Sequence, residues 1–363
     1  MDPGEFDAAG WDERGVLPVE VREAVARAGW LGTDIPVDHG GKGHSQRELG
    51  ELCAEIGAVC GSVRALLTVQ GMVSAAIARW GTAAQRAAWL PALATGDRLA
   101  GFAATETGAG TELSAVDTRF ERDGGVLTVT GGKRWITFGQ EATVFLVLGK
   151  LEGKLTTVLV EADRAGVTTE PVRGQLGLRA AMIAHVGFDG VRVPAENLLA
   201  PPGFGLSQVV TTALDHGRFT VAWGCAGMAA ACVDDAAGHT ARRRQGGVPL
   251  AAHELVRSML ARMAVDATAA RQLCVAAADA RDAKEPGAIA ATVMAKYAAA
   301  RAAASASQDA VQLLGSAGCA PDSRAGRFFR DAKVMQIIEG SDQVSELHIA
   351  DHLLRRYRTG ESA

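Results

Sequence analysis

The sequence predicts an α+β fold in which a β domain lies between two helical domains. Apolar residues recur about every 3.6 residues from Pro18 to about residue 100, and again after Gly205. Between these regions, β-branched and aromatic runs follow one another without a helix between them. We therefore expect an N-terminal α-helical domain (1–98), a middle antiparallel β-barrel domain (99–202) and a C-terminal four-helix bundle (203–363).

Short helices separated by glycine and proline are expected in the N-terminal region. Leu49, Leu52 and Ile56 would lie on one face of such a helix. Ser45 precedes Glu48 by three residues, which is the spacing of a capping box at a helix start.

The middle region is predicted to consist of antiparallel strands. Its β-branched and aromatic runs lie at 126–130, 135–138, 144–148, 156–160 and 184–193. Glycine-containing hairpin turns are expected at 123–125 and 152–154. Because no helix separates these strands, an antiparallel barrel or sandwich is favoured over a parallel α/β sheet.

Long alanine-rich helices are expected after Gly205. The amphipathic segments lie at 206–244, 249–284, 286–314 and 324–338, with short breaks at Gly and Pro between them. Long helices with short links are typical of an up-and-down four-helix bundle.

The composition argues against several classes of function. The net charge is −4, and no basic block exceeds Arg242–Arg244, so nucleic-acid binding has little electrostatic support. The apolar runs are too short for a membrane span, and the N-terminus does not resemble an export signal. Six cysteines lack metal-binding spacing, so we expect no metal and buried thiols in a reducing cytoplasm.

The segment 333–344 contains the principal candidate for a catalytic group. A helix-like apolar run ends at Ile337 and Ile338, Glu339 follows at once, and Gly340 allows the chain to turn away. A carboxylate at the end of a packed element can be desolvated and directed without disturbing the core, which is how a general base is commonly held. Taken alone, the segment fits a surface glutamate at a helix C-terminus equally well.

Four further segments suit a polar ligand, and each also has a purely structural interpretation. The loop 102–111 is a cradle for a phosphate or ring carbonyl, or simply a loop. Trp135 would lie against a flat ring or in the core. The segment 312–318 offers an amide and free backbone N–H groups, or is a glycine-capped helix end. The segment 242–247 is a cationic loop, or a solvated helix end. No GxGxxG follows a strand, so a nicotinamide site is not supported.

These motifs occur in one order on an α–β–α chain, and the combination resembles the acyl-CoA dehydrogenase family of flavoproteins. The resemblance extends from about residue 18 to residue 354. Segments 105–112 and 312–331 are similar to the two signatures of the family. Segment 133–137 is similar to its flavin-stacking strand, and 338–343 to its catalytic-base segment.

The resemblance implies that FAD lies extended between the β domain and the C-terminal bundle. The isoalloxazine would be surrounded by Phe102, Ala104, Thr105, Gly110, Thr111, Trp135, Ile136 and Thr137, with Ser341 and Gln343 near the middle of the flavin. The pyrophosphate and adenine would be contacted, partly from a neighbouring subunit, by Arg243, Gln245, His253, Gln312, Gly315 and Ser316. A homodimer or homotetramer follows from this sharing.

The resemblance also implies the catalytic roles. Glu339 would take a proton from the substrate α-carbon while a hydride leaves the β-carbon for flavin N5, and its backbone N–H would help to polarise the thioester carbonyl. Some members carry the base on a helix, at a position where this chain has Gly217, so Glu339 is the only candidate. The implied substrate-binding residues are Thr111, Asp215, Arg218 and Gly340.

The chain departs from the family pattern at several positions. Gly246 stands where an aromatic residue usually meets the adenine. Ser345, Glu346 and Asp351 replace polar and basic residues common in the last helix. These changes suggest that the phosphates of the acyl carrier are recognised differently.

A narrower resemblance is to the dehydrogenase-like enzymes of polyketide extender-unit clusters, in particular those that make methoxymalonyl on an acyl carrier protein. It implies a small hydroxylated acyl thioester on that carrier, with Glu339 accepting the hydroxyl proton. Motif chemistry does not distinguish this reaction from α,β-desaturation of an acyl-CoA. A repurposed flavin monooxygenase and a non-catalytic scaffold are the remaining alternatives, and the sequence does not indicate the electron acceptor.

Overall fold

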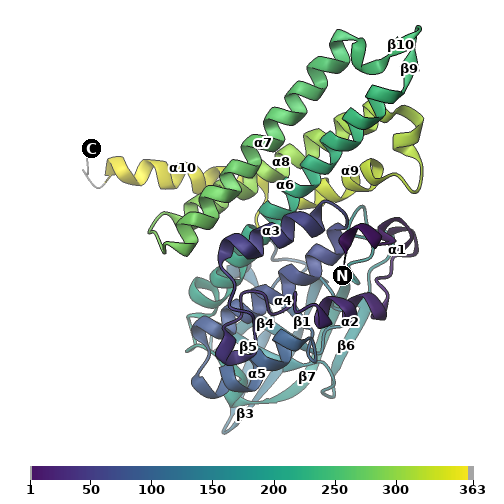
Figure 1. The fold of residues 1–363 in the computed structure, drawn as a ribbon. Helices are drawn as coiled ribbons and strands as arrows, with labels where there is room; N and C mark the ends of the chain where they lie inside the picture. Colours follow the sequence, from purple (N-terminus) through teal and green to yellow (C-terminus); the bar gives the residue numbers. More distant parts are fainter. Residues whose placement is uncertain (1, 359–363) are drawn as a thin grey trace.

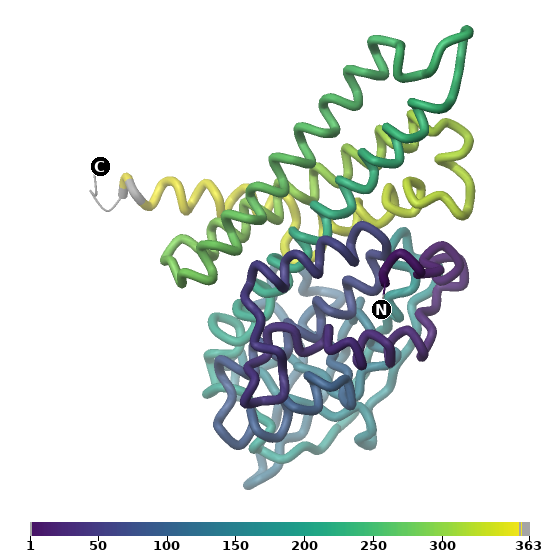
Figure 2. Tube along the Cα trace, viewed as in Figure 1, coloured from purple at the N-terminus to yellow at the C-terminus, as the bar shows by residue number. Residues whose placement is uncertain are grey.

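The N-terminal helices pack against the β-strands, and the long C-terminal helices extend away from both (Figures 1 and 2). The computed structural model describes residues 2–358. The N-terminal helices are α1 (Ala8–Arg14), α2 (Val19–Arg27), α3 (Gln46–Gly57), α4 (Gly61–Trp80) and α5 (Ala83–Thr95). The capping box predicted for Ser45 and Glu48 is confirmed at the start of α3.

Helix α4 forms the centre of the N-terminal region. Leu66, Val73 and Ile77 are 0% exposed, and the helix packs against β1 and α6. In the described part of the chain, α4 is the one helix that is long and apolar enough for a membrane span, which corrects the prediction that every apolar run is too short. Its most apolar 18-residue stretch is 89% buried inside the protein, so its apolar side chains form part of the core.

The β domain is a mostly antiparallel sheet. Its strands are β1 (Ala100–Ala103), β2 (Arg119–Asp123), β3 (Val126–Ile136), β4 (Val144–Leu151), β5 (Lys154–Glu161), β6 (Val167–Pro171), β7 (Ala184–Pro194) and β8 (Leu198–Leu199). Their order is β6-β7-β3-β2-β4-β5-β8, with β1 beside β4. The pairs Asp123/Val126 and Leu151/Lys154 confirm both predicted hairpin turns.

Two details of the sheet differ from the prediction. Strands β1 and β2 pair with β4 in parallel, because each reaches β4 through an intervening strand and loop rather than through a tight turn. The predicted strand 135–138 is not separate from 126–130, because β3 runs continuously to Ile136. The left-handed φ angles of Trp135 (61°) and Phe138 (54°) then turn the chain away from the sheet.

The C-terminal region contains the predicted helices and one more. They are α6 (Thr211–Arg242), α7 (Glu254–Asp282), α8 (Ala288–Leu314), α9 (Arg324–Met335) and α10 (Asp342–Arg358). Helix α7 begins later than predicted because a small hairpin, β9 (Arg244–Gln245) and β10 (Val248–Pro249), precedes it. Helix α10 leaves the bundle and points away from α7 and α8 (Figure 1).

Helices α3 and α6 approach closely at a glycine. A Cβ atom added at Gly227 of α6 would lie 2.0 Å from the carbonyl oxygen of Ala54 in α3. A side chain there would therefore push the two backbones apart, and with them the junction between the N-terminal helices and the bundle. Gly238, on the same helix, faces only the flexible end of Arg242, at 3.4 Å.

We predict that Gly227→Ala destabilises the protein by about 1–3 kcal/mol, because overpacking forces the backbones to move. The matched control Gly238→Ala is expected to stabilise by about 0.5–1 kcal/mol through the lower entropy of its unfolded chain. Urea-unfolding midpoints measure both effects. Equal midpoints for the two variants would contradict the close approach described here.

Candidate active site

The turn that carries Glu339 connects α9 to α10. Glu339 has a φ angle of 56° and Gly340 a φ angle of 98°, so two successive residues adopt a left-handed backbone conformation. For the glutamate this conformation costs about 1–2 kcal/mol. Such strain persists only where neighbouring groups hold it in place.

Two buried cations hold this turn. Arg218 on α6 donates from Nε to the carbonyl oxygen of Glu339 at 2.8 Å. Lys296 on α8 donates from Nζ to the carbonyl oxygen of Gly340 at 2.7 Å. Arg218 is 9% exposed and Lys296 is 0% exposed. Because charged donors shielded from water make strong hydrogen bonds, these contacts stabilise the strained turn.

The carboxyl group of Glu339 lies against α6. A Cβ atom at Gly217 would be 2.8 Å from Glu339 Oε2 and 3.0 Å from the sulfur of Met72. Within residues 2–358, Oε2 is buried and has no hydrogen-bonding partner. The alternative of a surface glutamate therefore does not describe this side chain.

The surroundings of Glu339 favour its protonated form. Burial raises the pKa of Glu339 to about 7, while the positive charges of Arg218, Lys296 and Arg64 act in the opposite direction. A carboxyl group with this pKa exists in both protonation states near neutral pH. Together with its free oxygen, this is the behaviour required of a general base.

A buried ion pair joins the two segments predicted to surround the isoalloxazine. Lys133 Nζ lies 2.6 Å from Glu106 Oε1 and donates to the carbonyl oxygen of Ala104 at 3.1 Å. The Glu106 carboxylate also accepts from the backbone N–H groups of Asp117 (2.6 Å) and Thr118 (3.1 Å). The loop 104–118 is thus fixed to the end of β3.

Trp135 lies at the end of β3 with its ring accessible. The residue is 56% exposed, and its ring is nearly perpendicular to that of His185 at a centroid distance of 5.5 Å. A large exposed indole with a left-handed backbone is unusual, and it offers an apolar surface to a planar ligand.

The other residues predicted near the flavin differ in exposure. The side chains of Ala104 and Ile136 are 2% exposed and pack in the core, so only their backbones can face a ligand. Partly exposed positions are Phe102, Thr105, Thr137 and Ser341, and exposed ones are Gly110, Thr111 and Gln343.

Asp215 is engaged within the protein. Its Oδ2 atom accepts from Arg281 Nη1 at 2.5 Å, which links α6 to α7. Its Oδ1 atom is buried and has no partner in the described residues. The substrate contact predicted for Asp215 remains a prediction, and the contact to Arg281 is one that the sequence did not indicate.

The residues predicted to contact pyrophosphate and adenine lie at the far end of the bundle. They are Arg243, Gln245, His253, Gln312, Gly315 and Ser316, and all are exposed. Arg243 follows Arg218 by 25 residues, which corresponds to about 38 Å along a helix at 1.5 Å per residue. The predicted pyrophosphate and adenine contacts of these residues remain a prediction.

Sequence reasoning missed three buried cations, Arg64, Lys133 and Lys296, which are 2%, 1% and 0% exposed. Lys133 belongs to the motif 133–137, but no role was predicted for it, and the sequence analysis assigned no role to Arg64 or Lys296 either. A signal was present for Arg64, because it is a single charge in the first part of a long apolar helix. Buried charges of this kind are rare unless they have a specific partner.

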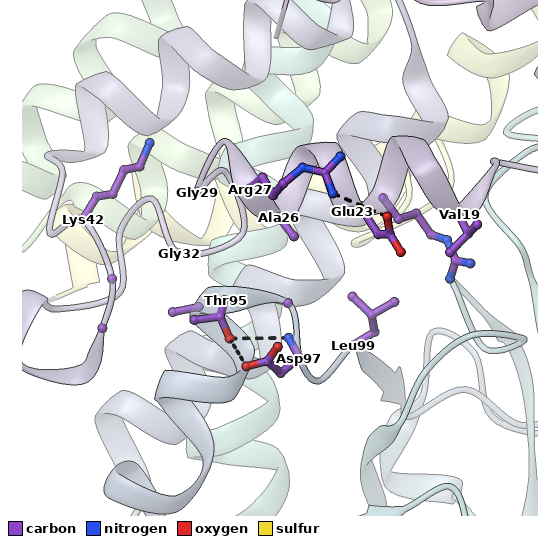
Figure 3. Close-up of a pocket in the computed structure, with 15 residues that line it drawn as sticks. Val19, Glu23, Ala26, Arg27, Gly29, Gly32, Lys42, Thr95, Asp97 and Leu99 are labelled. Atoms are coloured by element: carbon purple, nitrogen blue, oxygen red, sulfur yellow. Dashed lines mark hydrogen bonds and ion pairs between the residues drawn. The ribbon is translucent and has the colours of Figure 1, made fainter.

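A pocket of about 620 Å³ lies between α2, the loop that follows it and the end of α5 (Figure 3). Among the polar side chains on its wall, Arg27 pairs with Glu23 at 3.4 Å and Thr95 with Asp97 at 2.7 Å. None of the predicted site residues lines this pocket. In the described chain, no cluster of His, Cys, Asp and Glu side chains suits a metal ion.

Comparison with known proteins gives matches along nearly the whole chain. The N-terminal, middle and C-terminal domain profiles of acyl-CoA dehydrogenase match residues 5–97, 101–191 and 203–354. The mitochondrial short-chain specific acyl-CoA dehydrogenase of Mus musculus is 32% identical over 358 residues, covering 97% of this chain and 86% of that protein.

Two solved structures are similar in fold and sequence. FkbI, which serves biosynthesis of the methoxymalonyl extender unit of a polyketide immunosuppressant, is 38% identical, with a TM-score of 0.91 and 97% of each chain covered. A glutaryl-CoA dehydrogenase from Mycobacterium smegmatis in complex with FADH2 is 28% identical, with a TM-score of 0.91, covering 97% of this chain and 91% of that chain. The chain therefore belongs to the acyl-CoA dehydrogenase family.

Proposed function

We propose that the protein is an FAD-dependent dehydrogenase that oxidises a small acyl thioester, with Glu339 as its general base. The observation that carries this proposal is the buried, unpartnered Oε2 atom of Glu339, held in a strained turn beside Gly217. An oxygen in this state can accept a proton without breaking a hydrogen bond to the rest of the protein.

The residues at the end of β3 fit a flavin. The accessible indole of Trp135 suits one face of a planar ring, and no heavy atom lies within 4 Å of a Cβ position at Gly110. The loop carrying Gly110 is fixed to the same strand through Glu106 and Lys133. FAD supplies the acceptor for the hydride; the protein groups bind and orient the reactants.

The backbone of the turn has a second task in this proposal. Arg218 and Lys296 hold the carbonyl groups of Glu339 and Gly340, which fixes the two peptide units that follow Glu339. The backbone N–H of Glu339, at the start of this fixed turn, is proposed to polarise the thioester carbonyl and to acidify the proton that the carboxylate removes. Asp215 and Thr111 are proposed to contact the substrate as well.

We further propose that the acyl group is carried on an acyl carrier protein and bears a hydroxyl or aldehyde, as in methoxymalonyl extender-unit biosynthesis. The 38% identity to FkbI over 97% of each chain supports this assignment. The 32% identity to a short-chain acyl-CoA dehydrogenase supports the second candidate, α,β-desaturation of an acyl-CoA. All six cysteines are free thiols, which supports a cytoplasmic location. Five of them are buried as predicted, whereas Cys319 is exposed, which corrects the prediction for that residue.

A homodimer, alone or within a tetramer, is proposed from the length of α6. Arg243 lies about 38 Å along α6 from Arg218, a proposed substrate contact. We therefore propose that Arg243, Gln245 and His253 contact the cofactor of a neighbouring subunit. Gln312, Gly315 and Ser316 belong to the same end of the bundle and would act with them.

Glu339→Gln is expected to retain the yellow flavin and to slow anaerobic flavin reduction by acyl thioesters about a hundredfold to ten-thousandfold, the usual contribution of a general base. Stopped-flow absorbance with a panel of CoA and carrier-protein thioesters measures this rate. Glu285→Gln, an exposed carboxylate in the α7–α8 loop, is the matched control and should not change it. Unchanged reduction in Glu339→Gln would refute the assignment of the base.

The pH dependence of flavin reduction follows from the pKa of Glu339, which burial raises to about 7. Only the ionised carboxylate accepts a proton, so the rate should rise about tenfold per pH unit below this pKa and level off above it. Rapid-mixing measurements between about pH 5.5 and 8.5 test this. A rate that falls or stays constant as pH rises through neutrality would be inconsistent with Glu339 acting as the base.

A further inference from the structure

Trp135 lies at a bulge in the pairing of β3 with β7. Lys133 pairs with Val186, and Ile136 pairs with Ala184, with a shift of register between the two pairs. Two residues of β3, at positions 134 and 135, therefore lie opposite the single residue 185 of β7. A bulge of this kind interrupts the ladder of backbone hydrogen bonds and redirects the side chains of the bulged strand.

The two bulged residues donate their backbone N–H groups to different partners. The N–H of Arg134 donates to the carbonyl oxygen of Thr105 at 2.9 Å, and its Nε donates to Thr107 Oγ1 at 3.2 Å. The N–H of Trp135 donates to Nδ1 of His185 at 3.3 Å. The first residue is thus fixed to the loop 104–118, and the second is fixed to a side chain of β7.

The sheet holds His185 in place. Its neighbours Ala184 and Val186 are 0% and 1% exposed, so the partly exposed imidazole lies on the opposite, outer face of the strand. Strand β7 lies between β3 and β6, and His185 is the register partner of Glu170 in β6. Paired strands on both sides therefore fix the position of the acceptor nitrogen.

The imidazole contacts both the backbone and the ring of Trp135. The φ angle of Trp135 is 61°, a conformation that a bulky residue keeps only where its surroundings hold it. Nδ1 of His185 accepts from the backbone at this strained residue. The two rings are nearly perpendicular, with an interplanar angle of 87° and a centroid distance of 5.5 Å.

We infer that His185 is a positioning residue for the flavin, because it holds Trp135 in the conformation in which the indole packs against the isoalloxazine. The hydrogen bond carries this role more than the ring contact does, since it is directional and acts on the strained backbone. A tryptophan held in advance binds a planar ring without an ordering cost. This inference rests on the proposed function, which places the flavin at Trp135.

Two variants separate the hydrogen bond from the ring contact. His185→Phe keeps an aromatic ring but lacks the acceptor, whereas His185→Asn lacks the ring but offers a carbonyl oxygen near the position of Nδ1. Both replace a partly exposed side chain on the outer face, so the sheet is expected to fold. The measured quantity is the rate at which the holoprotein releases FAD on dilution, followed by flavin fluorescence without any thioester.

His185→Phe is expected to release FAD about twofold to tenfold faster than the parent, the effect of losing one net hydrogen bond on a dissociation rate. His185→Asn should release FAD at nearly the parent rate. His44→Leu, which removes an exposed histidine in the loop before α3, is the control and should not change the rate.

A second comparison tests whether His185 acts through Trp135. In a Trp135→Leu background, His185→Phe should cause no further acceleration, because the group that it positions is gone. A general loss of sheet stability would instead accelerate FAD release equally in both backgrounds.

Release of FAD from His185→Phe at the parent rate, or equal acceleration in the two backgrounds, would overturn the inference. Release from His185→Asn as fast as from His185→Phe, or faster, would overturn it as well. The fate of the proposed function is read separately, from anaerobic bleaching of the flavin by thioesters in the parent protein. The expected pattern of FAD release without bleaching by any thioester would reject the dehydrogenase and retain the role of His185.

Discussion

The hydrogen bonds from Arg218 and Lys296 to two successive carbonyl groups are the contacts on which the proposed active site depends. They come from α6 and α8, the long helices of the bundle, and they converge on a turn with left-handed φ angles at Glu339 and Gly340. Because both donors are charged and buried, the turn cannot relax without leaving a cation unpaired. The packed helices of the bundle thereby fix the direction of the Glu339 carboxyl group.

The order and type of the large elements followed from sequence because they depend on local periodicity and turn chemistry. The capping box at Ser45 and the two glycine hairpins are examples. The parallel pairing of β1 with β4 was missed, since strand partners are chosen by tertiary packing and not by the strand itself. The end of β3 was missed for a related reason: a left-handed Trp135 is imposed by its surroundings, not by its propensity.

The proposed catalytic centre was only partly accessible from sequence. Glu339 was recognised because a glycine follows an apolar run, and the motifs around it gave the family. The cations Lys296 and Arg64 stand in alanine-rich and apolar helices, where a charge gives no indication of which residue it faces. Burial and partners are properties of the folded chain, so the positive environment of the base emerged only when α4, α6 and α8 were brought together.

The absence of a side chain at Gly217 has an evolutionary consequence. The Glu339 carboxyl group occupies the volume that a residue on α6 would need, because a Cβ atom at Gly217 would lie only 2.8 Å from Oε2. A side chain at Gly217 would therefore displace the Glu339 carboxyl group from its present position. An acid introduced on α6 alone would place two acids in contact, and loss of Glu339 alone would leave the site with none. Moving the proton acceptor from the turn to the helix thus takes two coordinated substitutions.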